Sequence, residues 1–118
     1  EFISRNIPIQ IHIVQTSSCH PLIEDLGAFE FTDEESIAGA IVDIVALRKE
    51  ALVPLIDKTH GRGWYATNEK IRFAIDKTRE YTNLDISTNS ALSVVGLVDA
   101  IYDGYDFGNK PLCLICGQ

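Results

Sequence analysis

The stretch GWYATNEKI, residues 63–71, joins a short apolar run directly to the start of an amphipathic helix. Residues 63–66 predict a short strand, and Thr67 or Asn68 offers a side-chain oxygen that can cap the next helix. Glu69 falls in the first turn of that helix, where the helix dipole favours an anion. Helical spacing then continues to about Tyr81 along one face, through Ile71, Ala74, Ile75 and Thr78. A strand that leads straight into a helix indicates an α/β chain.

Upstream of this stretch the pattern predicts a strand and a helix. Residues 7–15 place Ile9, Ile11 and Ile13 at every second position, which is the period of a strand with one apolar face. Residues 46–59 carry an apolar stripe at helical spacing, and a glycine turn, HGRG at residues 60–63, ends that helix. Pro54 lies inside the stripe and either kinks the helix or starts a new one, because proline removes a backbone donor.

Two further upstream segments are less distinctive. Residues 19–26 predict a short helix with Ser18 as its cap and Gly27 as its stop. Residues 36–45 (SIAGAIVDIV) are apolar with small side chains, so they fit a strand and a helix equally well. Periodicity alone does not separate the two states in such a run.

Downstream, strand and helix alternate again. Residues 84–86 predict a very short strand, and Ser87 or Thr88 is placed to cap a helix that runs through Tyr102. Residues 111–116 (PLCLIC) form a continuous apolar run between turn signals, which predicts a strand covered on both faces. The chain is therefore expected to be a single α/β domain spanning residues 1–118, with layered helices on a small, at least partly parallel sheet. Glu1 and Phe2 resemble a cloning remnant and carry no weight in this interpretation.

Composition excludes several classes of protein. The 118 residues are 46% hydrophobic and 23% charged, which is the composition of a globular chain rather than a disordered one. A formal charge of −7 argues against nucleic acid or an anionic membrane as a partner. The sequence also lacks the ~18 uninterrupted apolar residues of a membrane span. Three cysteines without framework spacing predict reduced thiols and a cytoplasmic location.

The predicted helix at residues 91–101 is apolar nearly all round and needs cover on every side. A domain of this size buries only about 60–70% of the surface that its unfolded chain exposes. It can rarely surround such a helix completely. We therefore expect an apolar face that is covered either by the remainder of a longer parent chain or by another copy in a homo-oligomer.

Five segments, in order along the chain, match the pattern of one enzyme family. They are residues 13–22 (IVQ, then CHPL), 36–41 (SIAGAI), 61–71 (GRGWYATNEKI), 85–92 (DISTNSAL) and 112–117 (LCLICG). Together they resemble the C-terminal part of threonine synthase and its relatives, the tryptophan-synthase-β-like (fold type II) pyridoxal-phosphate enzymes. The resemblance implies that the chain is part of the large domain of such an enzyme. It also implies a parent lyase that performs elimination and replacement on O-phosphohomoserine or a related amino acid.

The resemblance also implies which residues would contact the pyridoxal phosphate of the parent enzyme. Cys116 matches the position beside the ring nitrogen of the cofactor, where a thiol or hydroxyl leaves that nitrogen largely unprotonated. Gly117 would let the backbone approach the cofactor closely. Asp85 and Ser87 would line the same pocket. Asp85 stands where the family has glutamate, and Asn89 replaces a small residue, which leaves the substrate open.

The family's Schiff-base lysine and glycine-rich phosphate loop lie upstream of the matched region, and nothing in this chain resembles either. The chain alone is therefore expected to have no catalytic residue, to hold no cofactor and to be inactive. In that family the cofactor carries the electronic work and the protein orients it. The alternative function is a stand-alone α/β module that binds a small metabolite or a protein partner.

The same residues have simpler interpretations. Asp85 and Ser87 could serve only as helix caps, and Cys116 could be a small buried apolar side chain. Cys113 and Cys116 invite a metal or redox interpretation, but residues three apart on a strand point to opposite faces. His12 is expected to face solvent or a neighbouring polar group.

Overall fold

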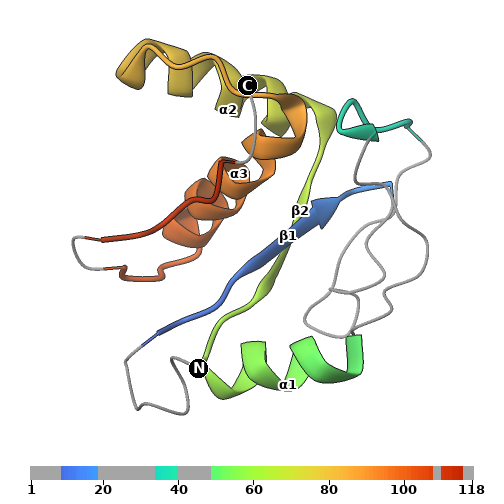
Figure 1. Ribbon diagram of the computed structural model, residues 1–118, viewed down its shortest axis with the longest axis vertical. Coiled ribbons are helices and arrows are strands. Elements are labelled where there is room, and N and C mark those ends of the chain that lie inside the picture. The colour runs from blue at the N-terminus through green and yellow to red at the C-terminus, as the bar shows by residue number, and fades with distance from the viewer. Residues whose placement is uncertain (1–8, 19–33, 40–48, 108–109, 116–118) are drawn as a thin grey trace.

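A computed structural model of the chain describes residues 9–18, 34–39, 49–107 and 110–115. The described part contains five elements (Figure 1). They are β1 (Ile13–Thr16), α1 (Lys49–Lys58), β2 (Gly63–Ala66), α2 (Asn68–Thr82) and α3 (Thr88–Tyr102). The α/β prediction is confirmed, because helices pack on a parallel sheet of two described strands. In the described part, no helix combines the length and the apolar character needed to cross a membrane.

The two strands run parallel, with Ile13 opposite Gly63 and Thr16 opposite Ala66. The Ser17 amide extends the ladder by donating to the Ala66 carbonyl at 3.0 Å. Parallel neighbours need a crossover connection, and α1 lies within the segment that joins them. In Figure 1, α2 and α3 lie on one side of the sheet and α1 lies on the other.

The core lies between the sheet and the pair of helices α2 and α3. Its buried members are Ala38, Ala66, Ile71, Ala74, Ile86, Ala91, Leu92 and Val95. The face predicted for α2 is therefore the face that is buried. α3 can approach the sheet closely because Gly96 has no side chain: a Cβ at that position would collide with the side chain of Val14. Any larger residue would push helix and sheet apart.

The ends of the helices follow the capping rules. Thr67 caps α2, and its hydroxyl accepts a hydrogen bond from the Lys70 amide at 3.3 Å. α2 ends at Asn83, which adopts a left-handed conformation with φ of 59°. At the end of α1 the left-handed residue is His60, with φ of 61°, rather than either glycine of the predicted glycine turn. Gly61 is needed for space instead, because a Cβ there would strike the carbonyl of Ile11.

Several predicted elements differ from the structure. α1 is a continuous helix with Pro54 inside it, so no new helix begins there. Of the strand predicted at residues 7–15, only the end from Ile13 pairs with β2, and described residues 9–12 form no strand. The strand predicted at residues 84–86 is also wrong. This segment has no strand beside it within the described residues, and it serves as the connection between α2 and α3.

The strand predicted at residues 111–116 is wrong over its described part, residues 111–115. Leu112 is 85% exposed and Leu114 is 69% exposed, so the run is not covered on both faces. It contacts α3 instead, where the Cys113 thiol lies 3.5 Å from the Ser93 carbonyl. A strand requires a neighbouring strand for its hydrogen bonds, and none lies beside this segment in the described part. The helix predicted at residues 19–26 lies outside the described residues. Of the run at residues 36–45, residues 36–38 are neither helix nor strand, Gly39 has a 3-10 helical conformation, and residues 40–45 lie outside the described residues.

Candidate functional site

Ser87, one of the four predicted cofactor-contact residues, is the N-cap of α3. Its hydroxyl oxygen accepts a hydrogen bond from the Ser90 amide at 3.2 Å and donates to the Ser90 hydroxyl at 3.1 Å. An uncapped helix start leaves backbone N–H groups without partners, and Ser87 provides the acceptor for one of them, the Ser90 amide. The Ser87 hydroxyl therefore uses its donor and one of its acceptor sites within the helix end.

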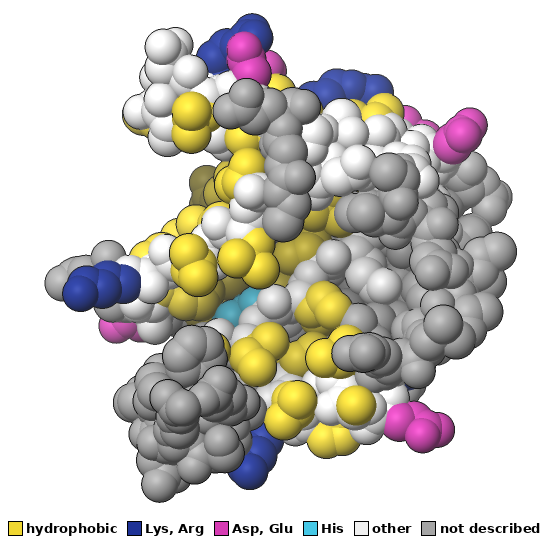
Figure 2. All heavy atoms as spheres, viewed as in Figure 1, with side chains coloured by type: hydrophobic (Ala, Val, Ile, Leu, Met, Phe, Trp, Pro, Cys, Tyr) yellow, Lys and Arg dark blue, Asp and Glu magenta, His cyan; other side chains and the backbone are white. Residues whose placement is uncertain are grey.

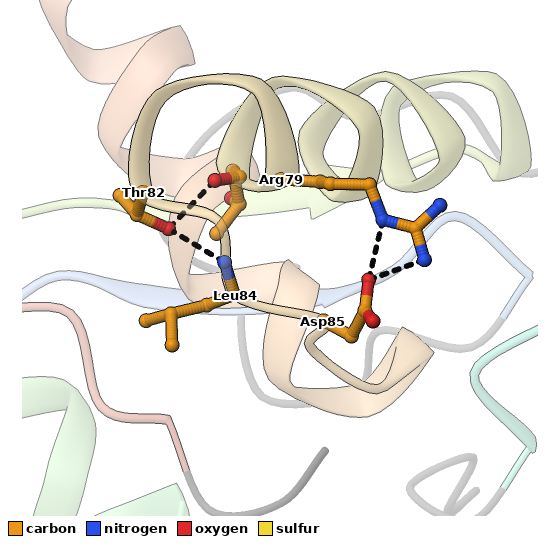
Figure 3. A network of polar contacts seen from close by, with 5 residues as sticks. Arg79, Thr82, Leu84 and Asp85 are labelled. Carbon is orange, nitrogen blue, oxygen red and sulfur yellow. Dashed lines mark hydrogen bonds and ion pairs between the residues drawn. The ribbon is translucent and has the colours of Figure 1, made fainter.

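Asp85 lies on the exposed surface of the connection between α2 and α3 (Figure 3). Its carboxylate forms an ion pair with Arg79 at 2.5 Å, and the two side chains are 68% and 66% exposed. The same connection is held by Thr82, whose hydroxyl donates to the Thr78 carbonyl at 2.6 Å and accepts from the Leu84 amide. Asp85 thus turns toward α2 and not toward a pocket shared with Ser87.

Asn89, in the first turn of α3, has a side-chain oxygen that is buried and lacks a hydrogen-bond partner; no other described side chain has such an atom. A buried acceptor without a donor costs about 1–3 kcal/mol, so such atoms usually have a partner. An incoming N–H or O–H group would satisfy it, whereas an anion would not. The sequence marked Asn89 only as a departure from the family pattern, and a polar side chain in the first turn of an apolar helix was the available signal.

The remaining predicted residues, Cys116 and Gly117, lie outside the described residues. Within the described part, Cys113 is half-buried, and burial raises the pKa of its thiol. In this structure Asp85 faces solvent and Ser87 serves as a cap, and their contact with the cofactor of a parent enzyme stays a prediction. We refer to residues 83–90, which include Asp85, Ser87 and Asn89, as the cap region.

A second group of polar and aromatic residues surrounds His12, which precedes β1. The Trp64 indole Nε1 donates to His12 Nδ1 at 2.9 Å, and His12 Nε2 lies 2.8 Å from the Gln10 side-chain oxygen. The Gln10 amide nitrogen then donates to the carbonyl of His60 at 3.0 Å. His12 therefore faces neighbouring polar groups, as expected from the sequence. Burial lowers the pKa of His12 below its ordinary value.

Two rings from the chain after α3 enclose the imidazole of His12. Tyr105 meets it edge to face at a centroid distance of 4.8 Å, and Phe107 does so at 5.3 Å. Tyr105 also contacts the indole of Trp64 at 5.8 Å. We call His12, Trp64, Tyr105 and Phe107 the ring cluster. No sequence pattern predicted it, since its members are separated by loops and helices and share no motif.

An open hollow of about 260 Å³ adjoins the ring cluster at the C-terminal end of α3. Its lining residues are Arg62, Trp64, Tyr65, Lys70, Asp99, Tyr102 and Asp103. Lys70 pairs with Asp99 at 2.8 Å. Arg62 pairs with Asp103 at 3.0 Å, and its guanidinium lies over the Trp64 ring at 4.8 Å.

The chemistry open to this hollow is limited. The two cations and two carboxylates neutralise one another, and the volume lies just below the ~300 Å³ at which ligand pockets usually begin. Among the described residues, no three His, Cys, Asp or Glu side chains converge as metal ligands.

A comparison with known proteins found no protein-family model and no curated sequence that matches the chain at a significant level.

Proposed function

We propose that this chain is the C-terminal part of a pyridoxal-phosphate enzyme of fold type II, of the threonine-synthase type, and that it is inactive alone. The parent would be a lyase acting on O-phosphohomoserine or a related amino acid. The proposal rests on the ordered resemblance of segments 13–22, 36–41, 61–71, 85–92 and 112–117 to that family. The cofactor would bind the parent enzyme, and none is expected in this chain alone.

The structural observation that supports the fragment part of the proposal is the exposed apolar run at residues 112–115. Figure 2 shows hydrophobic side chains gathered on a hollowed face of the molecule, over α3 and the chain that follows it. Leu112, Leu114 and Ile115 are all exposed, as are Ile101 and Tyr102 at the end of α3. Exposed apolar side chains that gather on one face mark an interface.

The first test is to determine the coding sequence upstream of residue 1. The proposal expects an open frame that continues into a segment with a Schiff-base lysine and a glycine-rich phosphate loop. A start codon placed just before Ile3 would overturn it and favour the stand-alone module. This test depends on no property of the purified protein.

A second test addresses inactivity. The purified chain is incubated with pyridoxal phosphate, reduced with borohydride and analysed by intact mass and peptide mapping, with the urea-unfolded chain as the control. We expect scattered, substoichiometric labelling of lysines that is similar in both samples. One equivalent on a single lysine, seen only in the folded chain, would show that the chain binds the cofactor by itself.

The alternative, a stand-alone module that binds a small metabolite or a protein, draws some support from the hollow beside the ring cluster. Sedimentation analysis separates the two ideas. A fragment should associate in proportion to concentration, and Leu112→Ser with Leu114→Ser should weaken that association because it removes exposed apolar area. A native chain that stays monomeric at every concentration would instead support the module.

A further inference from the structure

Segments that are distant in sequence meet at the imidazole of His12. The contacts come from four parts of the chain. Gln10 lies before β1, His60 lies in the turn after α1, Trp64 lies in β2, and Tyr105 and Phe107 follow α3. The His60 contact is indirect, through the side chain of Gln10. A single titratable ring therefore connects both strands to the chain that leaves α3.

The hydrogen bonds determine which nitrogen carries the proton. An indole N–H can only donate, so His12 Nδ1, which receives it at 2.9 Å, must be unprotonated. Nε2 then carries the hydrogen and donates to Gln10, whose own amide nitrogen donates to His60. The donors run in one direction from Trp64 to the His60 carbonyl. This direction holds only for a neutral imidazole.

Protonation would give the ring a second N–H, at Nδ1, and this group would face the indole N–H. Two donors would then oppose one another at a separation suited to a hydrogen bond, and the charge would lie in a partly buried site. The faces of Tyr105 and Phe107 can attract a cation, but they offer no acceptor strong enough to replace the bond. The folded arrangement therefore disfavours the charged ring, in agreement with the lowered pKa of His12.

The charged neighbours do not reverse this direction. Residues 9–16, which comprise β1 and the described residues before it, contain no ionisable side chain other than His12. Arg62, which lies over Trp64, is a further cation and is paired with Asp103. Asp106 lies between the two rings in sequence and is exposed, and it already has an interaction of its own. His60 takes part only through its backbone carbonyl, which accepts a hydrogen bond from Gln10, and the residue as a whole is exposed.

We propose that His12 is a pH-sensitive latch: the neutral imidazole holds the rings of Tyr105 and Phe107 against the sheet, and its protonation releases these rings, while the Tyr105 amide stays bonded to the Ala100 carbonyl. Because the pKa of His12 is lowered in the latched form, protonation does not weaken the latch above the ordinary histidine pKa of about 6.5. It weakens as the pH falls from there toward the lowered pKa. In that window the ratio of released to latched molecules rises about tenfold per pH unit.

Trp64 makes the test direct, because it is the only tryptophan in the chain. Its emission is followed from about pH 8 to pH 5 in the native chain, in His12→Asn and in the matched control His60→Asn. Asparagine at position 12 offers a side-chain oxygen as an acceptor near the position that His12 Nδ1 occupies in the native chain, and this side chain cannot be protonated. At position 60 asparagine tolerates the left-handed backbone of His60. We expect a transition in the native chain and in His60→Asn, and none in His12→Asn.

An unchanged transition in His12→Asn, or constant emission in the native chain, would overturn the proposal. A measurement on the native chain alone guards against a variant that fails to fold. The imidazole NMR signal of His12 and the backbone amide signals of Tyr105 and Phe107 should titrate with one common midpoint below about pH 6.5. Midpoints that differ between the imidazole and those amides would show that the ring does not hold the segment. None of these outcomes depends on the proposed enzyme family.

Discussion

The two ends of α3 are built in different ways. At its N-terminal end, the cap region relies on contacts between residues close in sequence, such as Ser87 with Ser90 and Arg79 with Asp85. At its C-terminal end, contacts join residues far apart, as in the hydrogen bond from Trp64 to His12 and the ion pair of Arg62 with Asp103. Local contacts need little of the tertiary structure, whereas distant ones require most of it. Substitutions at the two ends should therefore differ in their effect on stability.

The largest effect is expected for Trp64→Ala. Trp64 is buried, contacts Tyr105 and donates to His12, so its removal leaves a cavity and an unpaired ring nitrogen. We expect a loss of about 3–5 kcal/mol in the free energy of unfolding, measured by urea denaturation with circular dichroism. Asp85→Ala is the control in the cap region and should change stability by less than about 0.5 kcal/mol. Equal losses in the two variants would remove the distinction between the ends.

Gly61→Ala should have the next largest effect. Its Cβ would strike the carbonyl of Ile11, which cannot move freely because the Ile11 amide is bonded to the Thr59 hydroxyl at 3.1 Å. We expect a loss of about 1–3 kcal/mol, since overpacking forces the backbone to shift. Gly39→Ala is the matched control, because a Cβ at Gly39 meets nothing within 4 Å. A Gly61→Ala variant as stable as the native chain would mean that this close approach is not maintained in solution.

Ser87→Ala tests whether the cap region has only a structural role. Loss of the hydroxyl leaves the Ser90 amide without its acceptor, and we expect a cost of about 1 kcal/mol in thermal or urea unfolding. Ser87→Asn should restore most of this, because asparagine caps equally well. If Ser87→Asn is as unstable as Ser87→Ala, capping does not explain this serine.

The smallest effects on the free energy of unfolding are expected for two ion pairs, Lys70 with Asp99 and Arg79 with Asp85. Lys70 and Asp99 have side chains that are 37% and 23% exposed, whereas Arg79 and Asp85 are both about two-thirds exposed. Double-mutant cycles with alanine should give the Lys70–Asp99 pair the larger coupling, still below about 1 kcal/mol, and the Arg79–Asp85 pair a value near zero. Added salt should reduce the first coupling only partly. A stronger coupling for Arg79 with Asp85 would contradict the comparison.

Prediction from the sequence succeeded where a residue acts on its own neighbours. The strand at residues 63–66 was predicted at its observed position, and each cap was narrowed to two adjacent residues, of which Thr67 and Ser87 are the observed caps. Each of these features depends on a few adjacent side chains. It failed for residues 84–86 and 111–115, which were predicted as strands. An apolar run becomes a strand only when another strand lies beside it, and local pattern does not say which neighbours are present.

The candidate site divides in the same way. Helix capping was recognised beforehand as a possible role for Ser87, and its geometry agrees with that role. The ring cluster was not predicted, because no spacing in the sequence relates His12 to Trp64 or Tyr105. Their meeting depends on the parallel pairing of β1 with β2 and on the turn of the chain after α3.

The sequence by itself determined the α/β class, the apolar faces of the helices and, to within one residue, the caps of α2 and α3. These depend on periodicity and on side chains within a few positions of one another. Only the tertiary structure decided that His60, and not a glycine, takes the left-handed conformation, that Asp85 faces solvent, and that His12 receives a hydrogen bond from Trp64. These features depend on how strands and helices pack across the sheet, because contacts between distant residues form only when the whole chain has folded.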